Sequence, residues 1–331
     1  MRKIFILSAF ALIMAECLPC FGQNKQKRMA IVEYSANYMR QKPDYESGLE
    51  TQELMGTIVE IVGEDRYWRE IICPQPYKAW TTSLGLVEMS EDEIKNYERA
   101  PKYIFTAISG YLHTSPCEES PIICDLLGGD ILRKGQKTKG KWAEAILPSG
   151  RIGWVRKNHV EEHKHWLKHT KPSVESILKT ADMLMGTPYL WGGMTFKGVD
   201  CSGLVRICAI MNNLYLPRNA SQMVKCGKAV HMKVDERFWD DDYRKNNTEK
   251  YQKEMIKRVK NLQRGDLVFF GRPAKDGKKE RITHVGIYLG DNHIIHSSHE
   301  VRKNSLLPND LDFYENSHNL IKARRLELEQ L

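Results

Sequence analysis

The spacing of hydrophobic positions changes part-way along the chain. Between about residues 30 and 160, apolar residues come in short runs separated by turns, a pattern typical of β-strands. The clearest runs are residues 58–62, 68–72, 142–146 and 153–155. Beyond Pro172 the apolar positions return every three or four residues, which predicts a helix over 174–185. Ser173 is the expected N-cap of that helix and Gly186 its end.

The β-rich part contains an internal repeat. Trp68 and Trp80 are twelve residues apart, and so are Trp142 and Trp154. Each first tryptophan follows an apolar strand, and each second one closes a small hairpin. Two copies of one small β-barrel explain the repeat, and their expected bounds are residues 28–98 and 102–162.

The remainder predicts an α+β domain over residues 173–328. A basic, polar stretch at 163–171 is expected to be the linker that precedes it. A second helix is expected over 201–212, and an amphipathic helix over 248–259 within a polar insertion at 230–262. Antiparallel strands then follow at 266–271, 284–289 and 293–298.

Composition does not change the expected fold class, but it indicates in which compartment the protein acts. The 331 residues carry a formal charge of +8, spread along the chain without a basic arm, so no nucleic-acid partner is expected. A positive N-terminus and a short apolar run predict a signal peptide over residues 1–22. Cys17 and Cys20 leave lipoprotein anchoring open as the less favoured alternative. No later run is apolar enough to span a bilayer, so we expect an exported protein, periplasmic or extracellular, without stable membrane insertion.

The other cysteines do not predict a metal site. They lack paired ligand spacing, so neither a zinc site nor any other metal is expected; they are Cys73, Cys117, Cys124, Cys201, Cys208 and Cys226. Cys117 and Cys124 are placed either to form a disulfide or to remain free thiols.

One cysteine and two histidines form a candidate catalytic set. Cys201 begins a predicted helix, where backbone amides and the helix dipole favour a thiolate; the alternative is a structural cysteine like Cys208. With a hairpin turn centred on Asp291, His284 and His296 fall on one sheet face as diagonal neighbours. His284 is then the expected base, and His296 the group that orients it.

Five segments of the second part resemble the NlpC/P60 cysteine peptidases. They occur in that family's order over about residues 174–325: GTPYLWGG at 186–193, DCSGLV at 200–205, PRNASQ at 217–222, LQRGDLVFF at 262–270 and the hairpin at 283–298. The resemblance implies a papain-like α+β fold and a triad of Cys201, His284 and His296. It implies neither a metal nor an organic cofactor.

The two predicted barrels resemble the bacterial SH3 domains that this family often carries. This arrangement resembles the members that cut between D-glutamate and the diamino acid of peptidoglycan stems with a free N-terminal L-alanine. In such members Asp200 and Ser202 would grip the amine and backbone of the substrate. The other implied contacts are Tyr189, Trp191, Ser221 and Tyr77. Lys42 stands where an acidic amine-binding residue is expected, leaving Glu46 or Glu50 as substitutes.

The expected partners are therefore peptidoglycan stem peptides or muropeptides, and the expected activity is hydrolysis. Two alternatives stay open. The chain is a cell-wall-binding SH3 module with a degenerate peptidase, or its papain-like domain performs a different acyl transfer. Binding without turnover would identify the first alternative.

Overall fold

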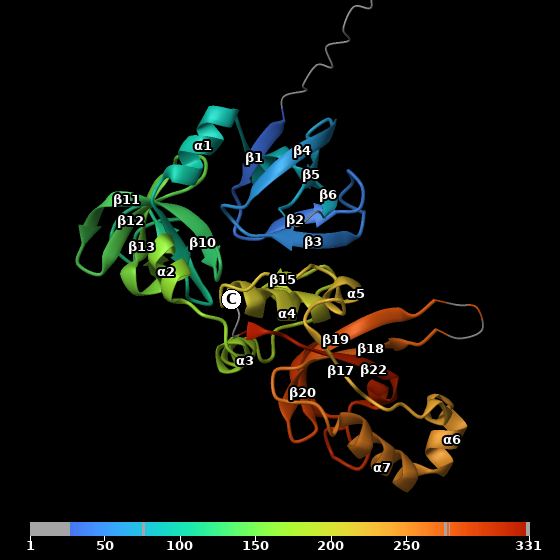
Figure 1. The fold of residues 1–331 in the computed structure, drawn as a ribbon. Coiled ribbons are helices and arrows are strands. Elements are labelled where there is room, and N and C mark those ends of the chain that lie inside the picture. Colours follow the sequence, from blue (N-terminus) through green and yellow to red (C-terminus); the bar gives the residue numbers. More distant parts are fainter. Residues whose placement is uncertain (1–26, 75–76, 275–276, 278, 329–331) are drawn as a thin grey trace, which may run out of the picture.

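The computed structural model describes residues 27–74, 77–274, 277 and 279–328 (Figure 1). The expected signal peptide, residues 1–22, lies outside these residues. Within the described part, no helix is long and apolar enough to cross a membrane.

The predicted repeat is confirmed as two antiparallel sheets with the same strand order. The N-terminal sheet has the order β3-β2-β6-β5-β4-β1-β7, and the middle sheet has β10-β9-β13-β12-β11-β8-β14. Adding seven to each label of the first order gives the second. The N-terminal strands are β1 (Arg28–Val32), β2 (Asn37–Arg40), β3 (Leu49–Glu53), β4 (Ile58–Asp65), β5 (Trp68–Ile72), β6 (Lys78–Thr82) and β7 (Leu86–Met89). The middle strands are β8 (Lys102–Phe105), β9 (Ser109–His113), β10 (Ile122–Leu127), β11 (Ile131–Lys139), β12 (Trp142–Ile146), β13 (Ile152–Arg156) and β14 (Val160–Glu162).

The tryptophans of the repeat occupy equivalent places. Trp68 and Trp142 begin β5 and β12, where both side chains are buried. Trp80 and Trp154 lie on the following strands, β6 and β13. A short 3-10 turn follows each of these strands, at Ser83–Gly85 and Lys157–His159. The twelve-residue spacing therefore reflects the same hairpin, which occurs once in each sheet.

One helix precedes the middle sheet in the chain and packs against β1 and β7 of the N-terminal sheet, and a second helix follows the middle sheet. α1 (Glu91–Arg99) connects the two sheets and starts with a capping box between Ser90 and Glu93. α2 (His163–His169) occupies most of the expected linker, which is therefore largely helical. Trp166 is buried and anchors one face of this helix, although the segment is otherwise largely polar.

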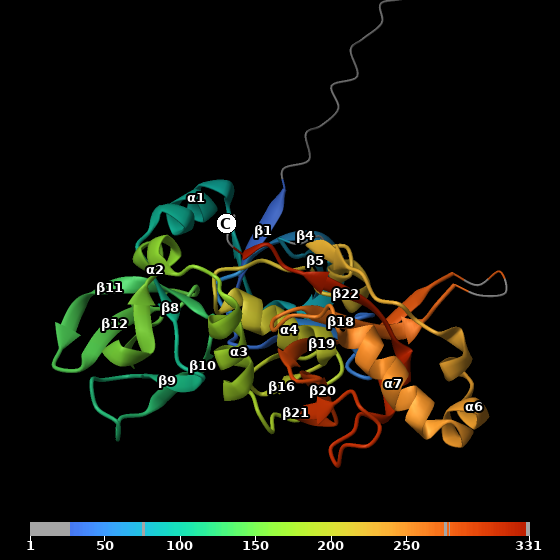
Figure 2. The same cartoon turned by 60° about the horizontal axis from the view of Figure 1, so that its bottom comes forward.

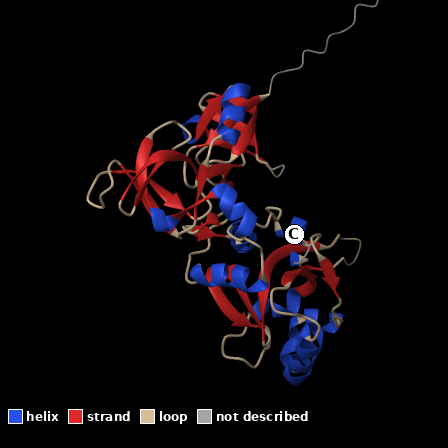
Figure 3. Cartoon of the chain, turned by 60° about the vertical axis from the view of Figure 1, so that its left-hand side comes forward, coloured by secondary structure: helices blue, strands red, loops and turns tan. Residues whose placement is uncertain are grey.

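The C-terminal part is α+β, as predicted (Figure 3). Its main sheet has the order β17-β22-β18-β19-β20-β21. The strands are β17 (Lys228–Val230), β18 (Leu267–Arg272), β19 (Arg281–Gly290), β20 (His293–Ser298), β21 (Glu300–Ser305) and β22 (Leu320–Arg325), with a small separate pair β15 (Met194–Thr195) and β16 (Gly198–Val199). The helices are α3 (Val174–Met183), α4 (Cys201–Ile210), α5 (Ala220–Met223), α6 (Asp241–Asn246) and α7 (Thr248–Val259), with 3-10 turns at Glu236–Trp239 and Glu315–Asn319.

Alternation along β18 separates two cores. Leu267 and Phe269 pack with α3 and α4, whereas Val268 and Phe270 pack with α7 on the opposite face. Successive strand residues point to opposite faces, so this strand is buried on both sides. Helix α7, which matches its predicted bounds, covers the face of the sheet away from α4 (Figure 2).

Candidate active site

Cys201 is the first residue of α4, and the N-terminal sheet lies beside α4 and β15 (Figure 1). Asp200 is the N-cap, and its side chain accepts a hydrogen bond from the backbone N–H of Gly203 at 2.7 Å. A Cβ on residue 203 would lie 1.9 Å from the carbonyl oxygen of Gly193. Glycine at position 203 therefore lets the glycine-rich turn lie directly on the helix that carries the thiol.

The backbone N–H groups of Ser202 and Val285 lie near the Cys201 sulfur and act to lower the pKa of the thiol. Val285 follows His284 on β19, so the thiol meets the strand that carries the candidate base. Burial, together with the charge of Asp200, raises the pKa of the Cys201 thiol to about 11. Burial therefore opposes the helix amides, which act in the direction expected at a helix start.

The two histidines meet as the hairpin register predicted. Ile287 pairs with Ile295 and Tyr288 with Ile294, which places residues 284 and 296 on one face. His284 Nε2 lies 2.8 Å from His296 Nδ1. The Tyr314 ring packs against both imidazoles, with centroids 5.8 and 4.6 Å away. Burial lowers the pKa of His284 to about 3 and that of His296 to about 4, so both are neutral at pH 7.

Asn304, on β21, fixes the tautomers of this pair. Its Nδ2 donates to the backbone carbonyl of Asp312 at 2.7 Å, so its Oδ1 faces His296 Nε2, 2.9 Å away. An amide oxygen only accepts, so His296 Nε2 carries the proton and its Nδ1 is an acceptor. His284 then donates from Nε2, which leaves the lone pair on its Nδ1 as the base.

We expect Asn304→Leu to lower kcat/KM by about 10–100-fold, a loss typical of partners that orient a functional histidine. Asn304→Asp keeps the acceptor for His296 and adds a negative charge, which favours the imidazolium and raises the histidine pKa. It should retain more activity and move the acid limb of the pH–rate profile upward. Equal losses without any change in the profile would reduce Asn304 to a packing role.

The neutral histidines also make stability depend on pH. An unfolded histidine takes up a proton near pH 6.5, whereas the buried His296 does so only near pH 4. Between those values the unfolded state binds more protons, so stability falls as pH falls. Urea unfolding at pH 7.5 and 4.5 should show about 2 kcal/mol less acid-induced loss in His296→Gln than in the wild type. An identical loss in both proteins would contradict the neutral assignment.

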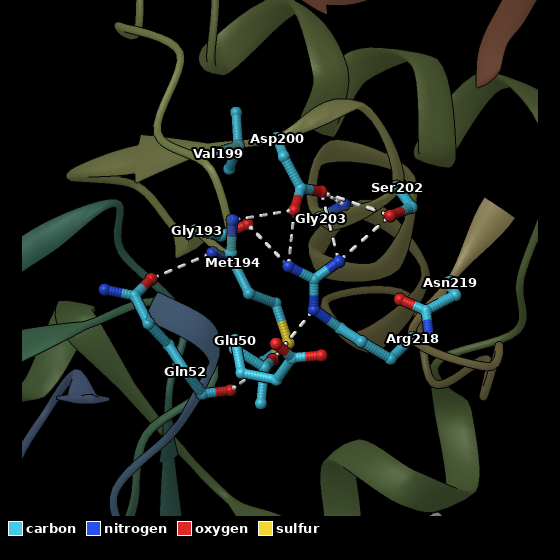
Figure 4. Close-up of polar contacts among 12 residues, drawn as sticks. Glu50, Gln52, Gly193, Met194, Val199, Asp200, Ser202, Gly203, Arg218 and Asn219 are labelled. Carbon is cyan, nitrogen blue, oxygen red and sulfur yellow. Dashed lines mark hydrogen bonds and ion pairs between the residues drawn. The ribbon is translucent and has the colours of Figure 1, made fainter. Parts of the chain in front are cut away.

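Asp200 and Arg218 form a buried ion pair beside the nucleophile (Figure 4). Arg218 Nη1 and Nη2 donate to the two carboxylate oxygens at 3.1 and 2.6 Å. Ser202 Oγ and the backbone N–H of Gly192 also donate to this carboxylate. Its carboxylate thereby holds the glycine turn and the start of α4. The substrate role that the resemblance implies for Asp200 stays a prediction.

Strand β3 of the N-terminal sheet forms one wall of the site. Thr51 Oγ1 accepts from Arg218 Nε at 2.7 Å, and Gln52 Oε1 accepts from the backbone N–H of Met194 at 2.8 Å (Figure 4). Gly192 has φ +76°, and a Cβ there would lie 3.0 Å from a carbonyl oxygen of β3. The sheet is thus fixed to the loop around the nucleophile by side chains and by close backbone contact.

The same strand brings together three polar side chains from distant segments. Tyr77 hydrogen-bonds Glu50, and it also interacts with the side chain of Asn219. Burial and Glu50 together raise the pKa of Tyr77 to about 12. Of the two candidate acids, Glu50 is half-buried in this group, whereas Glu46 is exposed.

The remaining predicted contacts lie around the thiol or at the surface. Tyr189 is half-buried, and burial followed by the Cys201 charge raises its pKa to about 12. Trp191 is 67% exposed, and Ser221 is exposed at the second position of α5. Ser202 is buried and occupied by Asp200 and Arg218, so its hydroxyl belongs to the ion-pair network.

Three functional side chains were not assigned roles from the sequence. Arg218 and Asn219 stand inside the PRNASQ segment, so that segment was the available signal. No sequence motif indicated Asn304, because its strand was not predicted. All six described cysteines are free, so Cys117 and Cys124 are thiols in this structure.

Comparison with known proteins adds independent findings. The profile described as NlpC/P60 family matches residues 186–312. The γ-D-glutamyl-L-lysine dipeptidyl-peptidase of Bacillus cereus is 26% identical over 275 residues, covering 78% of this chain and 70% of that protein. The probable endopeptidase NlpC of Escherichia coli is 33% identical over 142 residues, covering 43% of this chain and 70% of that protein.

A solved structure shares the whole architecture. The crystal structure of an NlpC/P60 family protein from Bacillus cereus aligns with a TM-score of 0.68 and 22% identity. The alignment covers 90% of this chain and 99% of that one. The likeness therefore extends through both N-terminal sheets as well as the α+β part.

Proposed function

Because the chain belongs to the NlpC/P60 family of cysteine peptidases, we propose that it is an exported endopeptidase that cuts peptidoglycan stem peptides. The proposed bond joins the γ-carboxyl of D-glutamate to the L-diamino acid, and the names of the most similar relatives support this choice. The observation that carries the proposal is the chain of hydrogen bonds from His284 through His296 to Asn304. The two histidines lie on strands that pack against α4, the helix that begins at Cys201.

The resting pair is a neutral thiol beside a neutral imidazole. The substrate carbonyl enters above the start of α4, and His284 Nδ1 takes the thiol proton as the sulfur attacks the γ-carbonyl carbon. The backbone N–H of Cys201 is placed to stabilise the oxyanion. Collapse of the tetrahedral intermediate breaks the C–N bond, and His284 returns its proton to the leaving amine. Water then attacks the thioester, with His284 again as the base, and restores the thiol.

Glu50, Tyr77 and Asn219 are proposed to bind the free amine of the N-terminal L-alanine. Glu50 supplies an anionic oxygen at the wall of the site, and Tyr77 holds that carboxylate in place. An ammonium group paired with a half-buried carboxylate forms a charge-assisted hydrogen bond worth about 1.5–3 kcal/mol. Because β3 is fixed to the loop around Cys201, the distance from Glu50 to the nucleophile would admit two residues between the free amine and the scissile bond. The SH3-like sheets thus serve as part of the substrate site.

The experiment compares stem peptides with free and N-acetylated L-alanine, their products being read by mass spectrometry. The proposal predicts cleavage of the free stem and little of the blocked one. Glu50→Gln should raise KM for the free stem about 10–100-fold, and Glu46→Gln, an exposed control from the loop before β3, should leave it unchanged. Equal turnover of both stems by the wild type would contradict the amine site.

A further inference from the structure

A histidine-rich segment lies outside the catalytic machinery. Four of the chain's eleven histidines fall within residues 159–169, and such tracts are typical of metal binding. The expectation of no metal rested on the spacing of the cysteines. Two histidines of this segment, His165 and His169, stand one helical turn apart. Helix α2, formed by this tract, turns both of them to one side.

Glu161, on β14, lies beside His165 and His169 on one face of α2. The two histidines are four residues apart on the helix and therefore share a face, with ring centroids 4.6 Å apart. Glu161 Oε1 lies 2.8 Å from His165 Nδ1 and 3.3 Å from His169 Nε2. One ligand atom from each of the three lies within 4.8 Å of the other two. The described residues hold one comparable group, His293 with Asp310 and Asp312, which offers a single imidazole.

The hydrogen bonds of His169 leave it ready to bind a metal. Its Nδ1 lies 2.8 Å from the backbone carbonyl oxygen of His165, which only accepts, so Nδ1 carries the proton. Nε2 is the atom directed at Glu161, and it is the nitrogen that can bind a metal once it has given up any proton. Metal-binding histidines typically donate their other N–H to a carbonyl in this way, which fixes the ring and the tautomer.

We propose that Glu161, His165 and His169 bind one divalent transition-metal ion of the zinc class. Two imidazoles and a carboxylate suit zinc, whereas calcium and magnesium prefer oxygen-only ligands. Binding replaces the proton of His165 Nδ1 by the metal and leaves Nε2–H toward solvent. Water completes the tetrahedral coordination.

The position of α2 gives this site a structural role. The helix packs against β8 and β14 of the middle sheet. At its other end, Asn213 Nδ2 donates to the carbonyls of Leu167 and Thr170, both at 3.1 Å, which ties the helix to the peptidase part. Trp166 on the inner face lines a cavity of about 750 Å³ between the sheets and α4. A metal on the outer face would therefore rigidify the junction between the middle sheet and the peptidase.

The test titrates zinc chloride into the full chain, kept reduced, by calorimetry and thermal unfolding. We expect one site, a raised Tm, and at least a tenfold loss of affinity in His165→Ala, His169→Ala and Glu161→Gln. The side chains of His165 and His169 are 71% and 50% exposed, so these variants should fold. His163→Ala in the same tract and His293→Ala in the other cluster should bind zinc like the wild type.

X-ray absorption separates this site from binding by free thiols. The site predicts nitrogen and oxygen ligands at about 2.0–2.2 Å and no sulfur. Unchanged affinity in the His165 and His169 variants, a zinc–sulfur shell, or no binding by the wild type would overturn the proposal. Stem-peptide hydrolysis by metal-free protein is expected to continue, so this result is independent of the proposed peptidase activity.

Discussion

Replacing Cys201 with alanine is expected to lower the rate of stem-peptide hydrolysis by about 10⁵-fold, because losing the nucleophile removes the covalent route altogether. Cys201 is only 9% exposed, yet alanine fits a helix start without strain. Initial rates on a synthetic stem peptide, together with urea unfolding, separate the chemical loss from a folding defect.

Cys208→Ala is the matched control for this variant. Cys208 lies on the same helix, is fully buried, and has its pKa raised by burial. The control should lose some stability and keep its rate within about threefold. Hydrolysis by Cys201→Ala at more than about 1% of the wild-type rate would exclude Cys201 as the nucleophile.

Replacing Arg218 with leucine is expected to lower the free energy of unfolding by about 3–5 kcal/mol, because the Asp200 carboxylate would be left buried without its cation. The Arg218 side chain is only 2% exposed, and it joins α4 to Thr51 of the N-terminal sheet. Hydrolysis should fall as well, since both the start of α4 and the wall of the site lose their anchor. Urea unfolding and kcat/KM measured on the same protein test both effects.

Two further variants show whether the ion pair causes the effect. Adding Asp200→Asn to Arg218→Leu removes the unpaired charge, so the double variant should be less destabilised than the sum of the single variants. Arg264→Leu breaks an exposed pair with Glu175 and should cost about 1 kcal/mol or less. Strict additivity of the first two substitutions would contradict a direct Asp200–Arg218 coupling.

Local patterns predicted the parts of this protein that depend on neighbouring residues. The turn at Asp291 set the register that joins His284 to His296, and the twelve-residue tryptophan spacing reported the two sheets. Amphipathic spacing also placed α7. In each case a short period in the sequence corresponds directly to one face of a strand or helix.

Contacts between distant segments were beyond such patterns. The Arg218–Thr51 bond joins residues 167 positions apart, and it depends on how the N-terminal sheet docks on the peptidase. The Asp200–Arg218 pair was not predicted for the same reason, since Arg218 comes from another loop. Asn304 was missed because β21 alternates too weakly to be predicted as a strand. Helix α2 was missed because a single buried tryptophan anchors it.

The central claim is that Cys201 attacks the γ-carbonyl of D-glutamate in a stem peptide. Rapid acid quenching during turnover, followed by peptide mapping with mass spectrometry, should detect the thioester intermediate. The account predicts an L-alanyl-γ-D-glutamyl group attached to the peptide that contains Cys201. An adduct on a different residue, or an acyl group of a different length on Cys201, would contradict the account.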